Sequence, residues 1–333
     1  MGVTIGRSRL PRIIRCAQVR GRPAANRGLS VNIGKLKLKN PVMAASGTFG
    51  YGEEFKDLVS LQDIGAIVTK SITLEPYEGN KPPRICETTA GMLNAIGLQN
   101  EGIDDFIKNK LPFLKKTETA IIVSIAGKTK NEYKELAKKL DKTQVDAIEI
   151  NISCPNISGH KLQATSYKLF AQDAKAASEI VKAVRAQTKK TIITKLSPNV
   201  TDIAEIAKAA EKAGSDAISL INTIVGMSID IETKRPRLGN VTGGLSGPAI
   251  KPIALRMVWE AYNSVKVPVI GMGGIMNTTD AVEFILCGAS AIQVGTANFV
   301  SPDSATQIIN GLKAYFKEKN ISSLKDITGK LQT

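Results

Sequence analysis

Short apolar runs alternate with longer amphipathic stretches along the chain from Leu29 onward. Each run is too short for a core helix and too continuously apolar for a half-exposed strand, which indicates buried parallel strands. The eight runs are residues 41–46, 66–70, 121–126, 147–152, 192–196, 217–222, 268–272 and 291–295. The stretches between them show helical periodicity, and Gly214 and Gly288 fall where helices should end. We expect helices near 53–62, 101–116, 130–142, 166–187, 201–213, 250–264, 277–287 and 302–319.

Eight strand-then-helix units predict an α/β fold, a closed (β/α)8 TIM barrel. A doubly wound open sheet is the alternative, but such a sheet rarely needs eight regular repeats. Three connections are long: 71–100 after the second strand, 153–165 after the fourth and 223–249 after the sixth. All three follow strands, so they should rise from the carboxyl end of the barrel, where such folds place their active sites.

The composition is that of a globular protein: 333 residues, 43% hydrophobic and 23% charged. No run approaches the roughly 18 apolar residues of a membrane span, which argues against a transmembrane enzyme. The four cysteines lack a C-x-x-C pair and His160 is the only histidine, so we expect no metal site in this chain. The thiols are expected to be reduced, as in cytoplasm.

About half of the net charge of +15 comes from the amino-terminal segment, since residues 1–29 hold seven arginines, no lysine and no acid. We therefore divide the chain into an Arg-rich extension, 1–28, and a barrel, 29–333. Three interpretations of the extension stay open. It could be an organellar targeting peptide, a translated upstream extension without function, or a nucleic-acid-binding arm.

The predicted strands end in polar or small residues, and these ends should converge on one mouth of the barrel. Lys70 and Lys195 are notable because each ends an otherwise apolar strand. Such a lysine either is solvated at the strand terminus or meets an anion. Two lysines at one mouth favour an anionic ligand. The ring comprises Ser46, Lys70, Ser124, Asn151, Lys195, Asn222, Gly273, Gly274, Gly295 and Thr296.

The glycines that follow the seventh and eighth strands favour a phosphate site. Backbone N–H groups and a helix N-terminus at these two loops bind phosphate in many barrels. The alternative is that the glycines only permit tight turns. The segment 271–274 is not a dinucleotide fingerprint, because the GxGxxG spacing is missing.

Cys154 opens the long loop after the fourth strand, within the sequence NISCPN. A cysteine there could be a small buried hydrophobe or a base or nucleophile over a ligand. Its position alone does not separate these alternatives.

Several motifs together resemble one family, the class 1 dihydroorotate dehydrogenases. In order, they are NPVMAASGTFGYG, TKSITLEPYEGN, GMLNAIGLQN, EINISCPN, ITKLSP, LINT, GGLSGPAIKP, GMGGI and VGTA, and they span the chain from about Leu29. The segment NTIVGMSIDIETKRPRLGN, with GGLSGPAIKP, is similar to subclass 1B. In that subclass the catalytic chain works with a separate iron–sulfur and FAD subunit that passes electrons to NAD.

The resemblance implies oxidation of (S)-dihydroorotate to orotate in pyrimidine biosynthesis, with FMN as first electron acceptor. FAD and a 2Fe–2S cluster would lie only on the partner subunit. The implied assembly has two catalytic and two electron-transfer chains, built on a homodimer of the catalytic chain. A dihydropyrimidine or tRNA-dihydrouridine oxidoreductase on the same flavin barrel is the enzymatic alternative. A basic nucleic-acid-binding protein is the non-enzymatic one.

The resemblance also assigns site residues. Cys154 would be the general base that removes a proton from C5 of dihydroorotate, while C6 delivers hydride to flavin N5. Ser124 stands where many subclass 1B relatives carry asparagine. The implied substrate residues are Lys70, Asn94, Ala95, Ile96, Gly97, Leu98, Asn151, Asn156, Asn222 and Thr223. The implied FMN residues are Ser46, Lys70, Ser71, Ser124, Asn151, Lys195, Ile221, Gly247, Gly273, Gly274, Gly295 and Thr296.

Overall fold

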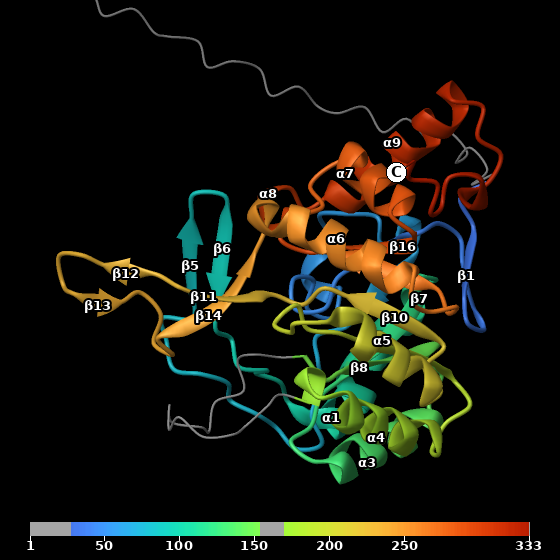
Figure 1. Ribbon diagram of the computed structural model, residues 1–333. Helices are drawn as coiled ribbons and strands as arrows, with labels where there is room; N and C mark the ends of the chain where they lie inside the picture. Colours follow the sequence, from blue (N-terminus) through green and yellow to red (C-terminus); the bar gives the residue numbers. More distant parts are fainter. Residues whose placement is uncertain (1–27, 154–169, 333) are drawn as a thin grey trace, which may run out of the picture.

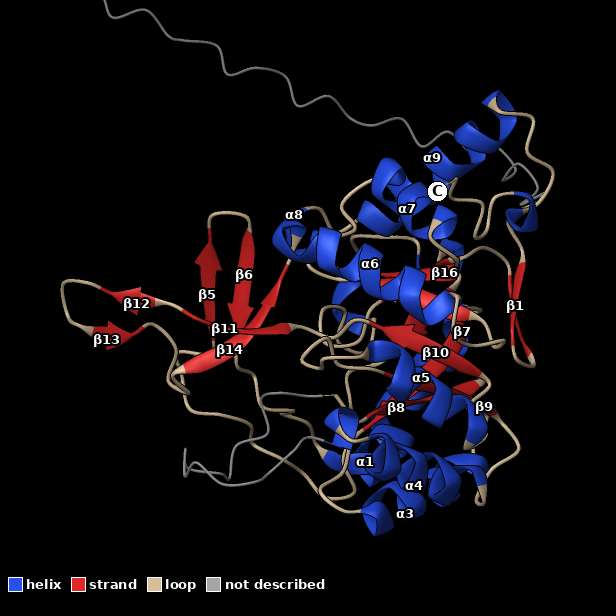
Figure 2. Cartoon of the chain, in the orientation of Figure 1, coloured by secondary structure: helices blue, strands red, loops and turns tan. Residues whose placement is uncertain are grey.

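A closed barrel of eight parallel strands forms the centre of the molecule, with helices packed around it (Figures 1 and 2). The computed structural model describes residues 28–153 and 170–332. In chain order the barrel strands are β3 (Val42–Ala44), β4 (Ala66–Val68), β7 (Ala120–Ile125), β8 (Ala147–Asn151), β9 (Thr191–Lys195), β10 (Ala217–Leu220), β15 (Val269–Met272) and β16 (Ala289–Val294). The last strand pairs with the first, Ile292 opposite Val42, so the predicted TIM barrel is confirmed.

The barrel strands are buried on both faces, which explains their continuous apolar sequence. Side chains such as Met43, Val68 and Ile193 pack inside the barrel in one cluster. Their sequence neighbours, including Ile67 and Ile192, belong to a second cluster with the surrounding helices. Both clusters are apolar, and the polar residues collect toward the carboxyl ends of the strands.

The helices of the outer layer lie close to the predicted ranges. They are α1 (Gly102–Asp105) with η3 (Phe106–Lys110), α2 (Leu111–Leu114) and η4 (Lys115–Thr117), then α3 (Lys130–Asp141), η5 (Phe170–Gln172), α4 (Ala174–Arg185), α5 (Ile203–Lys212), η6 (Pro248–Ile250), α6 (Lys251–Tyr262), α7 (Thr278–Leu286), α8 (Ala297–Val300), α9 (Ser304–Glu318) and η7 (Leu324–Asp326). Gly214 and Gly288 follow α5 and α7 with left-handed φ angles of 103° and 115°, as the sequence predicted.

The prediction of one helix over 53–62 was wrong. Only two short 3-10 turns form there, η1 (Glu53–Phe55) and η2 (Leu61–Asp63). Ser60 takes an extended backbone between them, and Leu61 is the one buried residue of the two turns. A segment that buries so little apolar surface lacks the packing that stabilises most helices.

A hairpin of β1 (Val31–Ile33) and β2 (Leu36–Leu38) closes the amino-terminal end of the barrel. Ile33, Leu36 and Leu38 pack in the same cluster as Met43 and the other interior residues. The sequence did not predict this hairpin, because three-residue strands are too short for their alternation to be recognised.

Two of the long connections form a second sheet that projects from one side of the barrel (Figure 1). The connection 71–100 supplies β5 (Ile85–Thr88) and β6 (Gly91–Asn94), and 223–249 supplies β11 (Ile224–Met227) and β14 (Thr242–Ser246). Their order is β11-β14-β6-β5. A short hairpin of β12 (Ile229–Asp230) and β13 (Arg235–Pro236) extends it. Most of the third connection, 153–165, lies outside the described residues.

None of the described helices is long and apolar enough to cross a membrane.

Candidate functional site

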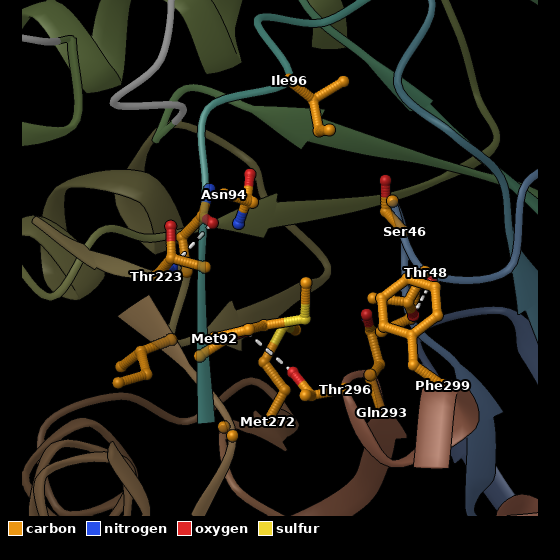
Figure 3. Close-up of a pocket in the computed structure, with 18 of the residues that line it drawn as sticks. Ser46, Thr48, Met92, Asn94, Ile96, Thr223, Met272, Gln293, Thr296 and Phe299 are labelled. Atoms are coloured by element: carbon orange, nitrogen blue, oxygen red, sulfur yellow. Dashed lines mark hydrogen bonds between the residues drawn. The ribbon is translucent and has the colours of Figure 1, made fainter. Parts of the chain in front are cut away.

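A cavity of about 390 Å³ opens at the carboxyl ends of the barrel strands. Figure 3 shows Asn94 and Thr223 on one side of it and Ser46, Thr48 and Phe299 on the other. Most of the residues selected from the sequence line this cavity: Ser46, Lys70, Ser71, Asn94, Ile96, Gly97, Leu98, Asn151, Lys195, Ile221, Asn222, Thr223, Gly247, Gly273, Gly274, Gly295 and Thr296.

Two of the selected residues stand behind the wall of the cavity. Ser124 is fully buried, and its hydroxyl lies 2.9 Å from that of Ser71, so it reaches the cavity only through Ser71. Ala95 is also fully buried, and its backbone N–H donates to the carbonyl of Arg84. Cys154 and Asn156, like His160, lie outside the described residues.

A chain of hydrogen bonds joins the polar ends of three barrel strands, β4, β8 and β10. Asn151 donates from Nδ2 to the hydroxyl of Ser71 over 2.9 Å. Its Oδ1 accepts from the hydroxyl of Ser153 over 3.1 Å, and that hydroxyl accepts from Nδ2 of Asn222 over 2.8 Å. The phenol of Tyr133 on α3 donates to the carbonyl of Asn151. The amides are thus fixed in orientation, which suits recognition of a ring that both donates and accepts hydrogen bonds.

Two lysines bring positive charge to the cavity. Lys195 is only 6% exposed, and its ammonium forms no hydrogen bond or ion pair with any of the described residues. Lys70 is half-buried; burial lowers the pKa of its ammonium, Arg84 adds to that effect, and the carboxylates of Glu54 and Glu101 oppose it. A buried ammonium that lacks a counterion among the described residues, as Lys195 does, is stabilised by an anion, and the half-buried Lys70 adds a second positive charge, so the two lysines favour a negatively charged ligand.

Glycines after β15 form a tight cradle on the β15 and β16 side. Gly273 and Gly274 have left-handed φ angles of 119° and 79°. A side chain at position 274 would bring its Cβ 2.8 Å from the Cβ of Lys251 and 2.9 Å from the carbonyl oxygen of Gly247. Lys251 is held by Asp280 at 2.6 Å, and the same carboxylate accepts from the N–H of Met276. The cradle therefore has a rigid support.

The projecting sheet supplies the wall that faces this cradle. Asn94, the last residue of β6, donates from Nδ2 to the carbonyl of Gly244 on β14 over 3.3 Å. A side chain at Gly244 would collide with Thr223, its Cβ lying 2.0 Å from the hydroxyl oxygen. Asn199 donates to the carbonyl of Thr223 and so fixes the start of the sixth connection. Asn94 and Thr223 are thereby held side by side.

Sequence reasoning missed several lining residues. Arg84 donates to Oε1 of Gln99 over 2.6 Å, which fixes that side chain at the cavity. Gln99, Thr48 and Ser246 lie within the motifs GLQN, SGTFG and GGLSG, so the motifs themselves were the signal that could have found them. The apolar residues that line the cavity carry no such signal, because their sequence pattern is the same as that of residues in the hydrophobic core. The missed residues include Thr48, Met92, Gln99, Ser246, Met272, Met276, Gln293 and Phe299.

The side chains that line the cavity are suited to bind a polar heterocycle together with an anionic group. Asparagine amides and two cations lie near a glycine cradle, with methionine and isoleucine side chains between them. Among the described residues, no group of three or more His, Cys, Asp or Glu side chains is placed to hold a metal ion.

Comparison with known proteins identifies the family of the chain. The family model described as "Dihydroorotate dehydrogenase" matches residues 28–316. A protein of Trichlorobacter lovleyi named "Dihydroorotate dehydrogenase B (NAD(+)), catalytic subunit" is 57% identical over 305 residues, covering 91% of this chain and 98% of the relative. A protein of the same name from Bacteroides thetaiotaomicron is 54% identical over 307 residues, covering 91% and 99%.

The fold is also shared with a solved structure. The crystal structure of DHODH from Eimeria tenella in complex with ferulenol superposes with a TM-score of 0.75 at 24% identity, covering 94% of this chain and 90% of that one. At this identity the likeness concerns the fold alone. Because the family model spans most of the chain and the relatives match along nearly their whole length, this chain belongs to the dihydroorotate dehydrogenase family.

Proposed function

We propose that this chain oxidises (S)-dihydroorotate to orotate as the FMN-containing catalytic subunit of an NAD-linked dihydroorotate dehydrogenase. The observation that carries the proposal is one cavity that unites oriented asparagine amides, the Lys195 ammonium, which is unpaired within residues 28–153 and 170–332, and the glycine cradle. The names of the relatives point to the same activity.

The residues of the cavity fit FMN. The cradle of Gly273, Gly274, Gly295 and Thr296 would hold the phosphate, because a Cβ at Gly274 would fill the space and glycine leaves the backbone open to close approach by an anion. Lys195 would stand beside the N1–C2 side of the ring, where a cation stabilises the anionic reduced form. Bound FMN would accept the hydride. The other residues proposed to contact it are Ser46, Lys70, Ser71, Asn151, Ile221 and Gly247, with Ser124 acting through Ser71.

The pyrimidine would lie between the asparagines and the projecting sheet. Asn94, Asn151 and Asn222 can each donate to a ring carbonyl and accept from a ring N–H. Lys70 would neutralise the substrate carboxylate. The remaining proposed contacts are Thr223, Asn156 and the backbone of Ala95, Ile96, Gly97 and Leu98, where Gly97 and Leu98 take left-handed φ angles that turn the chain at the cavity.

Cys154 is the proposed general base, taking the proton from C5 of the substrate. It directly follows Ser153, whose hydroxyl is held between Asn151 and Asn222. An ordinary thiol has a pKa of about 8.5, so the base works best at mildly alkaline pH or with an environment that favours the thiolate.

Electrons would leave through a partner that carries FAD and a 2Fe–2S cluster. The relatives are named as catalytic subunits, and in this chain Phe299 lines the cavity while 56% exposed, next to Val300 at 73%. An exposed apolar pair at the cavity is the place where such a partner would dock. We propose two catalytic and two electron-transfer chains, around a homodimer of the catalytic chain, located in the cytoplasm.

The test is to identify the flavin released by heating the purified chain, and to compare dihydroorotate with dihydrouracil as electron donors to a dye. We expect about one FMN per chain, no FAD, and reduction by dihydroorotate only. Release of FAD alone, or a preference for dihydrouracil, would contradict the proposal.

A further inference from the structure

One carboxyl group lies inside the barrel directly below the cavity. Glu149 on β8 is completely buried, and no other glutamate among residues 28–153 and 170–332 is classed as buried. Ser219 on β10 and Gln293 on β16 are its hydrogen-bond partners. Side chains from alternate strands meet in one layer of a TIM barrel, and these three strands alternate. Gln293 lines the cavity, so this layer is part of its floor.

Two neutral side chains donate hydrogen bonds to the carboxyl group of Glu149. Its Oε2 accepts two hydrogen bonds, from the hydroxyl of Ser219 at 3.1 Å and from Nε2 of Gln293 at 3.0 Å. Its Oε1 is buried and has no hydrogen-bond partner in the described part of the chain.

Lys195 brings an ammonium group to the layer of the barrel next to that of Glu149. It pairs across the sheet with Ser219 on one side and with Asn151 on the other, and Asn151 is two residues after Glu149. Glu149 itself is opposite Ile193, so the lysine stands one layer nearer the cavity. The carboxyl group of Glu149 thus lies one layer below Lys195 in a buried part of the barrel, where a charge on either residue would act strongly on the other.

We propose that Glu149 is a positioning residue that sets the reduction equilibrium of the bound flavin. The inference rests on the proposed function, since it concerns the FMN placed above. The carboxylate holds the amide of Gln293 at the floor, and its charge offsets part of the stabilisation that Lys195 gives to the anionic reduced flavin. The reduced form of the flavin is thereby made less stable, which favours electron transfer to the partner.

The decisive measurement is the midpoint potential of the FMN-loaded chain in the variant Glu149→Gln. Loss of the charge should favour reduced flavin by about tenfold, a rise of about 30 mV for a two-electron couple. Glu149→Asp keeps the charge and should stay within about twofold of wild type. Glu205→Gln, which removes an exposed charge on α5, is the matched control and should leave the potential unchanged.

The outcomes separate this inference from the proposed function. A wild-type chain that binds no FMN would overturn both. FMN bound normally, with an unchanged potential in Glu149→Gln, would overturn the role of Glu149 alone. A merely structural role would lower the melting temperature of both Glu149 variants without moving the potential.

If Glu149→Gln does not fold, the wild-type holoprotein still tests the charge. Infrared spectra of protein labelled with 13C-glutamate distinguish an ionised from a protonated buried glutamate. A carboxylate signal alone supports the inference, and a protonated-glutamate band at neutral pH overturns it.

Discussion

The side-chain amide of Asn222 donates to the hydroxyl of Ser153 over 2.8 Å, which ties the sixth barrel strand to the residue before Cys154. The same hydroxyl donates to Asn151, so Ser153 stands between two asparagines of the cavity wall. The chain therefore enters the segment of Cys154 from a fixed point.

Replacing Cys154 by serine should slow flavin reduction by dihydroorotate by about 10²-fold, the typical effect of a lost general base. FMN content and orotate binding should be unchanged. The residual rate should rise with pH beyond the wild-type plateau, because a serine hydroxyl ionises less readily than a thiol. Stopped-flow absorbance at the flavin band gives these rates.

Cys287→Ser is the matched control for this experiment. Burial raises the pKa of the Cys287 thiol, with a smaller contribution from Glu283, and the residue directly follows α7, away from the cavity. Its replacement should leave flavin reduction near the wild-type rate. A near wild-type rate for Cys154→Ser would instead return Cys154 to the role of a small buried hydrophobe.

Lys195→Met should disfavour the reduced flavin by about tenfold or more, which lowers the potential by about 30 mV, opposite to the effect of Glu149→Gln. The neutral side chain cannot stabilise the anionic reduced form. Photoreduction in the presence of a reference dye measures the shift. Lys190→Met is the control, since its ammonium donates to the carbonyls of Thr143 and Val145, just before β8 begins. An unshifted potential in Lys195→Met would place the flavin elsewhere.

Gly274→Ala should weaken FMN binding by about tenfold or more and lower the melting temperature of the apoprotein, because φ there is 79° and the new Cβ would meet Lys251 and Gly247. Gly295→Ala makes a useful contrast, since its Cβ would meet nothing closer than 3.7 Å. Gly295→Ala should weaken FMN binding. It should leave the melting temperature of the apoprotein within about one degree of wild type, because substitutions that cause no steric clash usually change stability little. Fluorescence titration and thermal unfolding measure the two quantities. Normal FMN affinity in both variants would argue against the cradle.

Val300→Asp should weaken binding of the electron-transfer partner by about tenfold or more, as expected for a charge introduced into an apolar interface. Dye reduction by the isolated chain should be unaffected, because Val300 is not among the residues that line the cavity. Affinity for the purified partner can be measured by surface plasmon resonance. Ile231→Asp, at a side chain 80% exposed in the β12–β13 hairpin, is the comparison. Loss of binding in Ile231→Asp alone would move the docking surface to the projecting sheet.

The fragment 28–333 should retain FMN and dihydroorotate oxidation. Gly28 belongs to the fold, since its carbonyl accepts from the N–H of Leu324 over 3.0 Å, but the Arg-rich segment before it differs in composition from the barrel. Flavin absorbance and dye reduction of the fragment are the measurements. Loss of both would mean that residues 1–27 complete the fold.

The sequence was sufficient to predict the barrel and most of the cavity, because parallel strands carry a strong apolar signal and their polar ends converge by topology. It was not sufficient for Ser124. The alternation of the strand predicts that the Ser124 side chain points into the barrel. The sequence does not show that Ser71 lies between Ser124 and the cavity. Glu149 was passed over for a similar reason. Glu149 lies within an apolar strand, and its hydrogen-bond partners Ser219 and Gln293 are 70 and 144 residues away in the sequence. No local sequence pattern relates residues so far apart.

The hydrogen bond from Asn94 to Gly244 joins residues 150 positions apart in the chain. Pairing β6 with β14 encloses four barrel strands between them, so its loop-closure entropy is lost only as the barrel assembles. The wall proposed to meet the pyrimidine therefore depends on long-range pairing, and its formation is coupled to the assembly of the four barrel strands that lie between β6 and β14 in the chain.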